Sequence, residues 1–353
     1  MKKIVIVAPI PGSLINFRGE LIQDIKDKGC EVITVSPPPS EVYSNIFKQK
    51  KIVNIPITFI SNKINLLNDF ICLIKLFRIF RKQSPDVILS YTIKPVIWGG
   101  LASRFLKIDF YALITGLGFA FQGTSFKRKL LTKLVVFLYR VALKKSKAVI
   151  FQNKDNLNIF VDKGIVPISK TYLVNGSGVD IDKFNVEALP KGTIHFLCIS
   201  RLLTEKGLRE YAAAAKIVKK KFPSVIFNLV GGEDTSHDAI SLDEVNNWSD
   251  YISYRGSTMD VRSYIKDSHV YTLPSYHEGL PRSTLEAMSM GRAVLTTDAV
   301  GCKETVENSI NGFIVPVGSV DKLAEKMIWF IEHPEQIAPM GLESRRMVVE
   351  KFD

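Results

Sequence analysis

The sequence P-S-Y-H-E-G-L-P-R-S-T-L-E, residues 274–286, decides the fold, because it directly follows a short apolar run at residues 270–273. The run is rich in residues that favour strands. Pro274 and Gly279 then interrupt the chain, and Pro281 suits the first turn of a helix. We therefore predict a strand, a sharp turn and a helix in this order.

Two carboxylates, Glu278 and Glu286, fall near the start of that predicted helix. The first backbone N–H groups of a helix lack intrahelical partners and can bind an anion, while carboxylates accept hydrogen bonds from hydroxyls. A phosphate joined to a polyol, as in a nucleotide sugar, fits both properties. The stretch alone leaves an alternative open, since a glutamate in a first helical turn also stabilises the helix dipole.

The first half of the chain alternates short apolar segments with helical stretches, which is typical of a doubly wound parallel sheet. Ligands of such sheets bind beyond the carboxyl ends of the strands, so we expect Gly12, Lys94 and the turn at residues 115–118, with Thr115 and Gly116, to face one crevice. The predicted strands are residues 3–8, 31–35, 86–90, 110–114 and 148–152, with a turn at 9–13 and a helix at 17–28.

The second half repeats this alternation, after a stretch at residues 175–191 that is typical of a linker. Its predicted strands are residues 193–200, 225–230, 251–254, 270–273, 293–297 and 313–315, with a helix at 207–221. We predict an α/β protein with two Rossmann-like domains that face a cleft, residues 1–185 and residues 193–353.

Composition excludes several other classes of protein. No stretch of eighteen residues lacks charge, so no membrane-spanning helix is predicted. The apolar start of the chain is short, β-branched and followed by a glycine turn, so we interpret it as a strand instead of a signal peptide. The four cysteines are scattered without paired spacing, which suggests neither a zinc site nor a disulfide framework.

Positive charge is concentrated in the first half of the chain. Residues 1–190 hold 28 Lys and Arg against 13 Asp and Glu, whereas the rest holds 19 against 22. Such a basic half favours an anionic partner, either nucleic acid or an anionic membrane surface. Two predicted helices, residues 65–82 and 126–147, interleave Lys and Arg with Leu and Phe and could lie on a bilayer, or could be core helices with a solvated basic face.

The sequence S-R-L-L-T-E-K-G, residues 200–207, lies between a predicted strand and a predicted helix of the second domain. Arg201 at the strand end and Lys206 at the helix start would both point into the cleft, where a guanidinium and an ammonium suit a diphosphate. Ordinary solvated surface cations are the alternative interpretation.

This motif, the turn V-G-G at residues 230–232, the pair Glu278 and Glu286, and E-A-M-S-M-G-R-A-V at residues 286–294 together resemble the GT-B glycosyltransferases of family 4. These enzymes use a nucleotide sugar and retain anomeric configuration. The resemblance implies that Arg201 and Lys206 bind the donor diphosphate, that Glu286 binds the ribose and that Glu278 faces the donor hexose.

The resemblance implies further donor contacts from Gly279, Leu280 and Arg255, and from Gly12, which would let the first-domain loop approach the phosphates. It also implies a metal-independent enzyme without a cofactor, in which cations and helix N–H groups stabilise the departing UDP. A diphosphate oxygen would take the acceptor's proton, so no protein base is assigned.

The first half resembles a narrower group through the sequences S-Y-T-I-K-P-V-I-W-G at residues 90–99, A-L-I-T-G-L-G-F-A-F at residues 112–121 and N-F-R-G at residues 16–19. They are similar to those of enzymes that extend undecaprenyl-diphosphate-linked glycans, including N-acetylgalactosaminyltransferases. The resemblance implies acceptor contacts from four residues: Arg18, Lys94, Thr115 and Gly116.

Two features depart from the family pattern. Several relatives carry a histidine in the loop that corresponds to residues 115–118, and this chain has none there. We assign His277, beside Glu278, to local packing instead. Relatives also end in a helix that crosses back to the first domain, whereas this sequence ends at residues 351–353.

The expected activity is transfer of a sugar, with N-acetylgalactosamine as one candidate, from a UDP-sugar to a polyprenyl-diphosphate-linked glycan. The expected location is the cytoplasmic face of the inner membrane, as a peripheral protein on an anionic surface. A transferase with a soluble acceptor and a UDP-sugar epimerase stay open as alternatives. A nucleic-acid-binding module is disfavoured, because no nucleic-acid motif is present and the basic helices carry leucine stripes.

Overall fold

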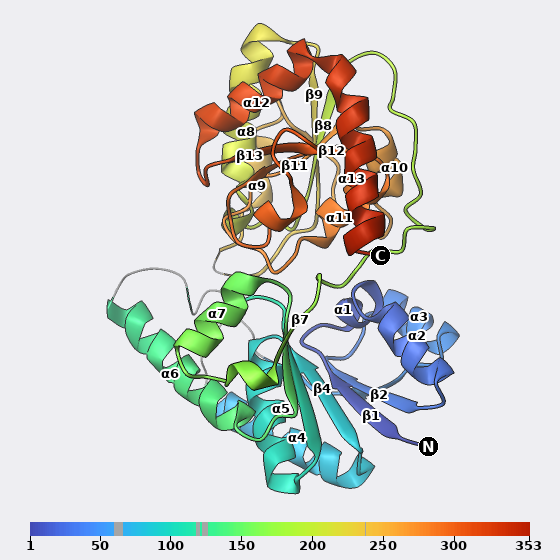
Figure 1. Cartoon of the computed structure of the whole chain (residues 1–353), viewed down its shortest axis with the longest axis vertical. Coiled ribbons are helices and arrows are strands. Elements are labelled where there is room, and N and C mark those ends of the chain that lie inside the picture. The colour runs from blue at the N-terminus through green and yellow to red at the C-terminus, as the bar shows by residue number, and fades with distance from the viewer. Residues whose placement is uncertain (60–65, 118–120, 122–125, 237) are drawn as a thin grey trace. The chain divides into compact units, whose positions relative to one another are not determined.

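The computed structural model describes residues 1–59, 66–117, 121, 126–236 and 238–353 (Figure 1). The chain divides into two compact units, Met1–Val174 and Asn175–Asp353. Each unit has its own parallel sheet and its own hydrophobic core. This architecture confirms the predicted α/β class with two Rossmann-like halves.

The described residues of the N-terminal unit form a seven-stranded sheet in the order β3-β2-β1-β4-β5-β6-β7, with parallel neighbours throughout. The order reverses between β1 and β4, which is the switch point where ligands bind in open α/β sheets. The strands are β1 (Lys3–Val7), β2 (Glu31–Ser36), β3 (Val53–Pro56), β4 (Val87–Tyr91), β5 (Asp109–Ile114), β6 (Ala148–Phe151) and β7 (Thr171–Leu173).

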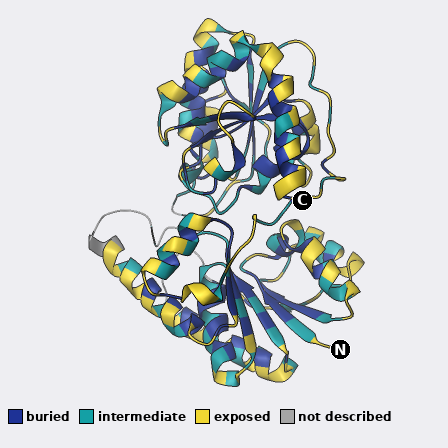
Figure 2. Ribbon diagram, in the orientation of Figure 1, coloured by how far each residue is buried: buried dark blue, intermediate teal, exposed yellow. Residues whose placement is uncertain are grey.

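Helices cover both faces of this sheet and generate two clusters of buried side chains. Leu14, Ile22 and Phe47, from α1, α2 and α3, pack on one face, while α4, α5, α6 and α7 bury apolar side chains on the other. Figure 2 shows the strands mostly buried and the outer sides of the helices exposed. The helices are α1 (Pro11–Asn16), α2 (Gly19–Asp27), α3 (Glu41–Gln49), α4 (Leu66–Gln83), α5 (Ile93–Leu106), α6 (Phe126–Leu143) and α7 (Lys154–Asp162).

The C-terminal unit contains a six-stranded parallel sheet in the order β10-β9-β8-β11-β12-β13. Its order reverses between β8 and β11, so the loops that follow these two strands flank the switch point. The strands are β8 (His195–Ile199), β9 (Ile226–Val230), β10 (Ser253–Tyr254), β11 (Val270–Leu273), β12 (Ala293–Thr297) and β13 (Gly312–Val315).

The helices of the C-terminal unit share one continuous buried cluster with its sheet, in which the strand β11 is buried at every residue. The predicted strand, turn and helix at residues 270–286 are therefore confirmed, with Pro281 immediately before the helix as its N-cap. The helices are α8 (Leu208–Lys221), α9 (Leu242–Asn246), α10 (Arg262–Lys266), α11 (Arg282–Ser289), α12 (Val320–Glu332) and α13 (Ile337–Lys351).

The division between the units lies before residue 175, earlier than the predicted end of the first domain at 185. The prediction of a free linker over residues 175–191 is wrong for part of that stretch. Val179 and Phe184 are buried in the core of the C-terminal unit, and the Val179 N–H donates to the Phe352 carbonyl at 2.9 Å. Apolar side chains isolated between glycines and aspartates gave no periodic signal, so the packing was not predictable from local pattern.

Two further boundaries differ from the prediction. The turn expected at residues 9–13 contains the start of α1, because Pro11 occupies the first helical turn, where its missing N–H costs nothing. The helix expected at residues 126–147 ends at Leu143, whose carbonyl accepts hydrogen bonds from the Ser146 N–H and hydroxyl groups. The predicted turn residue Gly118 lies outside the described residues.

Candidate functional site

Two loops that are distant in sequence meet at the switch point of the C-terminal sheet. Residues 200–207 follow β8, and residues 274–281 follow β11. The Glu205 carbonyl joins the loops, because it accepts hydrogen bonds from the Tyr276 N–H at 2.8 Å and from the Ser275 hydroxyl at 3.0 Å. The sequence predicted functional residues in these same two loops.

Gly207 allows this close approach. It adopts a φ of +69°, and a Cβ atom there would lie 1.9 Å from the Pro274 carbonyl oxygen. Only glycine tolerates both the left-handed backbone and the contact. The glycine of the S-R-L-L-T-E-K-G motif is thus explained by packing between the two loops.

Lys206 and Glu278 form the direct side-chain link between the loops. The Lys206 Nζ lies 2.8 Å from Glu278 Oε1 and 3.5 Å from Glu205 Oε1, and the Lys206 and Glu278 side chains are largely buried. Burial alone would lower the pKa of Lys206, but the charges of Glu278 and Glu205 outweigh it and raise the pKa above its ordinary value. Lys206 is therefore a fixed ammonium at neutral pH.

Arg201 extends the positive region beyond Lys206. Its guanidinium forms an ion pair of 2.5 Å with Asp234, which follows the Gly-Gly turn after β9, and its side chain is 57% exposed. Burial tends to raise the pKa of Asp234, but hydrogen bonds from Ser236 and the charge of Arg201 lower it below its ordinary value. The charge of Arg201 also lowers the pKa of Lys206, so the two cations act on one region.

Asp234 was missed by the sequence reasoning. Its signal was present, since it follows the sequence V-G-G-E at the end of a predicted strand. What the sequence could not supply was the spatial order of the strands, which makes β9 the neighbour of β8.

Glu286 occupies a separate position on α11. Its carboxylate accepts a hydrogen bond from Arg282 Nε at 2.9 Å, and its side chain is largely buried. Burial raises the pKa of Glu286 above its ordinary value, although the Arg282 charge opposes this shift. The first turn of α11 is joined to the end of β8, because the Ser283 hydroxyl donates to the Ile199 carbonyl at 3.1 Å.

The other three residues predicted to bind the donor in the C-terminal unit also lie at the carboxyl edge of its sheet, but on different loops. Gly279 and Leu280 are half-buried and immediately precede Pro281. Arg255 follows the edge strand β10, two strands from β8, and its Nε donates to Asn228 Oδ1 at 3.0 Å. Neither a hydrogen bond nor an ion pair joins Arg255 to Lys206 in the described part of the chain.

In the N-terminal unit, the predicted residues Gly12 and Arg18 gather around the end of β4. The hydroxyls of Ser13 and Tyr91 share a hydrogen bond of 2.7 Å, and the Arg18 guanidinium lies 5.3 Å from the centre of the Tyr91 ring. Arg18 is buried, and burial raises the pKa of Tyr91 to about 12. A Cβ atom at Gly12 would lie 2.6 Å from the Tyr43 hydroxyl oxygen, so a side chain at this position would have to displace the Tyr43 ring.

Lys94 lies in the first turn of α5, beside the same switch point. Its Nζ forms an ion pair of 2.9 Å with the buried carboxylate of Asp69, in the first turn of α4. Thr92, directly before α5, has a φ of +68°, which is strained for a β-branched residue. Thr115 and Gly116 follow β5 and are half-buried.

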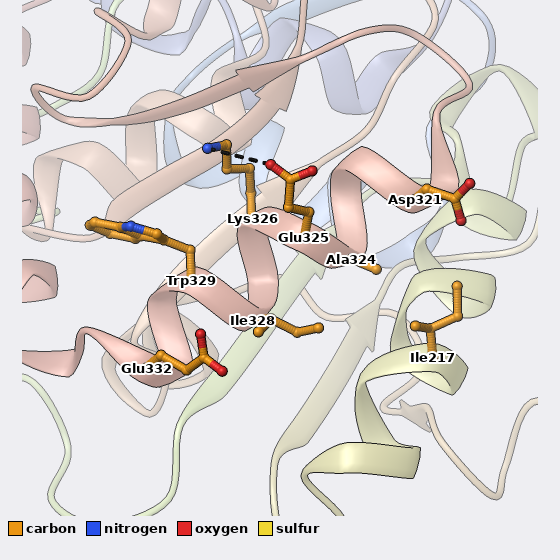
Figure 3. Close-up of a pocket in the computed structure, with 8 residues that line it drawn as sticks. All are labelled: Ile217, Asp321, Ala324, Glu325, Lys326, Ile328, Trp329 and Glu332. Atoms are coloured by element: carbon orange, nitrogen blue, oxygen red, sulfur yellow. Dashed lines mark ion pairs between the residues drawn. The ribbon is translucent and has the colours of Figure 1, made fainter.

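No cluster of metal-ligating side chains accompanies these residues in the described part of the chain. No three His, Cys, Asp or Glu side chains there gather in a way that could hold a metal ion. A hollow of about 390 Å³ lies elsewhere, where Ile217 of α8 faces side chains of α12 (Figure 3). None of its lining residues is a predicted site residue.

Comparison with known proteins assigns each unit to a sequence family. Residues 180–347 match the family described as glycosyl transferases group 1, and residues 14–153 match the family described as glycosyl transferase 4-like. The chain is a glycosyltransferase. Each match lies within one of the two units, and together they span most of the chain.

Two curated relatives share this assignment. The glycosyltransferase is 28% identical over 341 residues to the N,N'-diacetylbacillosaminyl-diphospho-undecaprenol alpha-1,3-N-acetylgalactosaminyltransferase of Campylobacter jejuni, covering 91% of this chain and 87% of that protein. It is 25% identical over 304 residues to the UDP-Gal:alpha-D-GlcNAc-diphosphoundecaprenol alpha-1,3-galactosyltransferase of Escherichia coli, covering 82% and 77%.

Solved structures confirm the fold of the glycosyltransferase as GT-B, with family 4 membership supported by the two sequence families. The structure of Anabaena HepE in complex with UDP and glucose matches with a TM-score of 0.80 at 18% identity, covering 100% of this chain and 96% of that one. The family matches describe transferases, so the epimerase and the nucleic-acid-binding alternatives have no support.

Proposed function

We propose that this glycosyltransferase moves a sugar from a UDP-sugar to a polyprenyl-diphosphate-linked glycan, with retention of anomeric configuration. The observation that carries the proposal is the Lys206–Glu278 ion pair of 2.8 Å, which puts a cation and a hydroxyl acceptor together at the switch point of the sheet. In a UDP-sugar, the diphosphate requires a cation and the sugar hydroxyls require a hydrogen-bond acceptor.

Each charged residue has a proposed role in the donor complex. Lys206 and Arg201 bind the diphosphate and stabilise the charge that grows on UDP as the sugar departs. Glu278 accepts hydrogen bonds from the hexose hydroxyls, and Glu286 accepts them from the ribose. Gly279 and Leu280 lie beside Glu278 and bring backbone N–H groups to the donor.

The reaction breaks the bond between the anomeric carbon and the UDP oxygen and forms one to the acceptor oxygen. We assign the acceptor's proton to a departing diphosphate oxygen, so no protein side chain is needed as a base. The two cations supply the charge that a metal ion would otherwise provide, and we propose that the transfer is metal-independent and uses no cofactor.

The proposed acceptor follows from the relatives and from the N-terminal unit. The names of both relatives specify undecaprenyl-diphosphate-linked glycans. Arg18 and Lys94 lie at the switch point of the N-terminal sheet, and Thr115 and Gly116 follow the next strand, β5. We propose these four residues as the diphosphate-side contacts of the acceptor, and the cytoplasmic face of the inner membrane as the peripheral location of the enzyme.

The test is an assay of the purified protein with radiolabelled UDP-sugars and a polyprenyl-diphosphate glycan acceptor. We expect label in the lipid product, an unchanged rate after treatment with EDTA, and an α-linkage from an α-linked donor in the NMR spectrum of the product. Transfer to a soluble glycan without transfer to any lipid-linked acceptor would contradict the proposed acceptor. A rate abolished by EDTA and restored by a divalent cation would contradict metal independence.

A further inference from the structure

Helix α6 of the N-terminal unit exposes apolar side chains that are not part of the hydrophobic core of the unit. Leu130, Leu134 and Phe137 are exposed, although Val135, Val136 and Tyr139 of the same helix already fill the core. Lys129 and Lys133 are exposed between the apolar ones, and neither makes an ion pair with a described acidic residue. Exposure of three large apolar side chains together is unfavourable in water, so a helix in contact with water alone is not expected to carry them.

Helix α4 repeats this pattern on its own outer side. Leu67, Phe70 and Ile71 are exposed near its start, while Lys75 and Arg78 are exposed further along. The spacing from Leu67 through Ile71 and Lys75 to Arg78 is four, four and three residues, so these side chains share one stripe of the helix. We call the exposed apolar and basic side chains of the two helices the α4–α6 face.

Both helices start at the sheet edge that holds the proposed acceptor contacts. A helix that leads into a parallel strand runs antiparallel to it, so α4 and α6 begin at the carboxyl edge of the sheet. The ion pair between Lys94 and Asp69 shows this directly for α4, since Asp69 lies between Leu67 and Phe70. Figure 1 shows α4 and α6 among the helices of the N-terminal unit.

We propose that the α4–α6 face docks on an anionic phospholipid bilayer and thereby holds Lys94 at the level of the lipid headgroups. This inference rests on the proposed function, because a lipid-linked acceptor presents its diphosphate at that level. Apolar side chains would enter the region between headgroups and acyl chains, and Lys and Arg would pair with anionic headgroups.

The composition of the face selects this partner over others. It contains both large apolar side chains and cations, whereas a nucleic-acid surface would not require exposed Leu, Ile and Phe. In the described part of the chain, no helix combines the length and the apolar character of a membrane span. Asp69, the acidic residue of α4, is buried and paired with Lys94 and does not oppose an anionic surface.

The test is co-sedimentation of the full chain, without substrates, with vesicles of phosphatidylethanolamine and phosphatidylglycerol. Leu130→Ser and Phe70→Ser should each weaken binding on the order of tenfold, because each removes a large apolar side chain from the interface. The paired substitutions Lys129→Gln and Lys133→Gln should weaken it by about fivefold per charge. Binding of the unsubstituted protein should fall as salt increases and should be weak on neutral phosphatidylcholine vesicles.

The control is Leu342→Ser on α13 of the C-terminal unit, whose side chain is 63% exposed compared with 62% for Leu130. It should bind vesicles as the unsubstituted protein does. Equal binding by Leu130→Ser, Phe70→Ser and the control would overturn the proposal, as would loss of self-association in these variants with vesicle binding intact. An assay of sugar transfer in detergent separates the membrane-docking proposal from the proposed function. Variants of the α4–α6 face should keep their transfer activity in detergent. If neither the unsubstituted protein nor any variant transfers sugar there, the result counts against the proposed function alone.

Discussion

Arg201 allows function to be separated from stability at a single residue, because its side chain is mostly exposed and its ion pair with Asp234 contributes little to folding. We expect Arg201→Ala to lower kcat/KM on the order of a hundredfold, by removing one donor to the departing diphosphate. Steady-state kinetics and thermal unfolding would show a large loss of rate with a nearly unchanged Tm.

Arg209→Ala is the matched control, since Arg209 pairs with Glu244 in the same unit and is also substantially exposed. It should leave the rate unchanged. Equal losses in the two variants, or a folded Arg201→Ala with full activity, would remove Arg201 from the proposed site.

Glu286 should impose a pH dependence on stability. Burial raises its pKa in the folded state above the ordinary value of 4.5, so the folded protein holds a proton that the unfolded chain has lost. The contribution of Glu286 to the free energy of unfolding is fully present below pH 4.5 and is lost as the pH rises through the folded-state pKa.

Glu286→Gln removes this titration. The free energy of unfolding of the variant, relative to that of the unsubstituted protein, should increase from pH 4.5 upward until the folded-state pKa is passed. Urea denaturation at a series of pH values measures it, and a relative stability that falls with pH over that window would contradict the shift.

Among the elements, the contact between the β8–α8 and β11–α11 loops depends on Gly207. In Gly207→Ala the new Cβ would collide with the Pro274 carbonyl, so the two loops must separate. We expect a loss of transfer activity together with a drop in stability larger than backbone strain alone would cause.

Gly192→Ala is the control, because Gly192 also has a positive φ but no atom within 4 Å of its ideal Cβ position. It should cost only about 1–2 kcal/mol of strain and leave the rate unchanged. Similar stability and activity for the two variants would show that the loop contact is unimportant.

The elements also show what the sequence could predict. Short buried strands such as β11 and β12 are rich in apolar and β-branched residues, with Pro274 directly after the first and Gly291 shortly before the second, so their positions followed from the pattern. The meeting of Lys206 with Glu278 required the strand order, and the prediction obtained it only from a family resemblance. The ion pair between Asp69 and Lys94 was not predicted, because an ion pair between two different helices produces no pattern in the sequence of either helix.

For the whole molecule, the position of the unit boundary predicts which fragments fold. A fragment of residues 175–353 keeps Val179 and Phe184, whereas one that starts at residue 193 loses both from the core. Arg345 would also lose the Ile181 and Phe184 carbonyls that accept its hydrogen bonds. We expect the longer fragment to unfold cooperatively in urea and to bind UDP in calorimetry.

The shorter fragment should be less stable by about 1.5–3 kcal/mol for each lost apolar side chain, with further loss from the unpaired guanidinium. Equal midpoints of urea denaturation for the two fragments would show that residues 175–192 contribute nothing to the C-terminal unit.

The two sheets share one arrangement, since β3-β2-β1-β4-β5-β6 and β10-β9-β8-β11-β12-β13 have the same relative order, and each unit carries its own interior. A crossover between genes near codon 174 would therefore exchange an intact half. In evolution, such a crossover would replace the half that we propose to bind the acceptor and leave the other half unchanged. Chimeras joined at that codon would reproduce such an event in the laboratory.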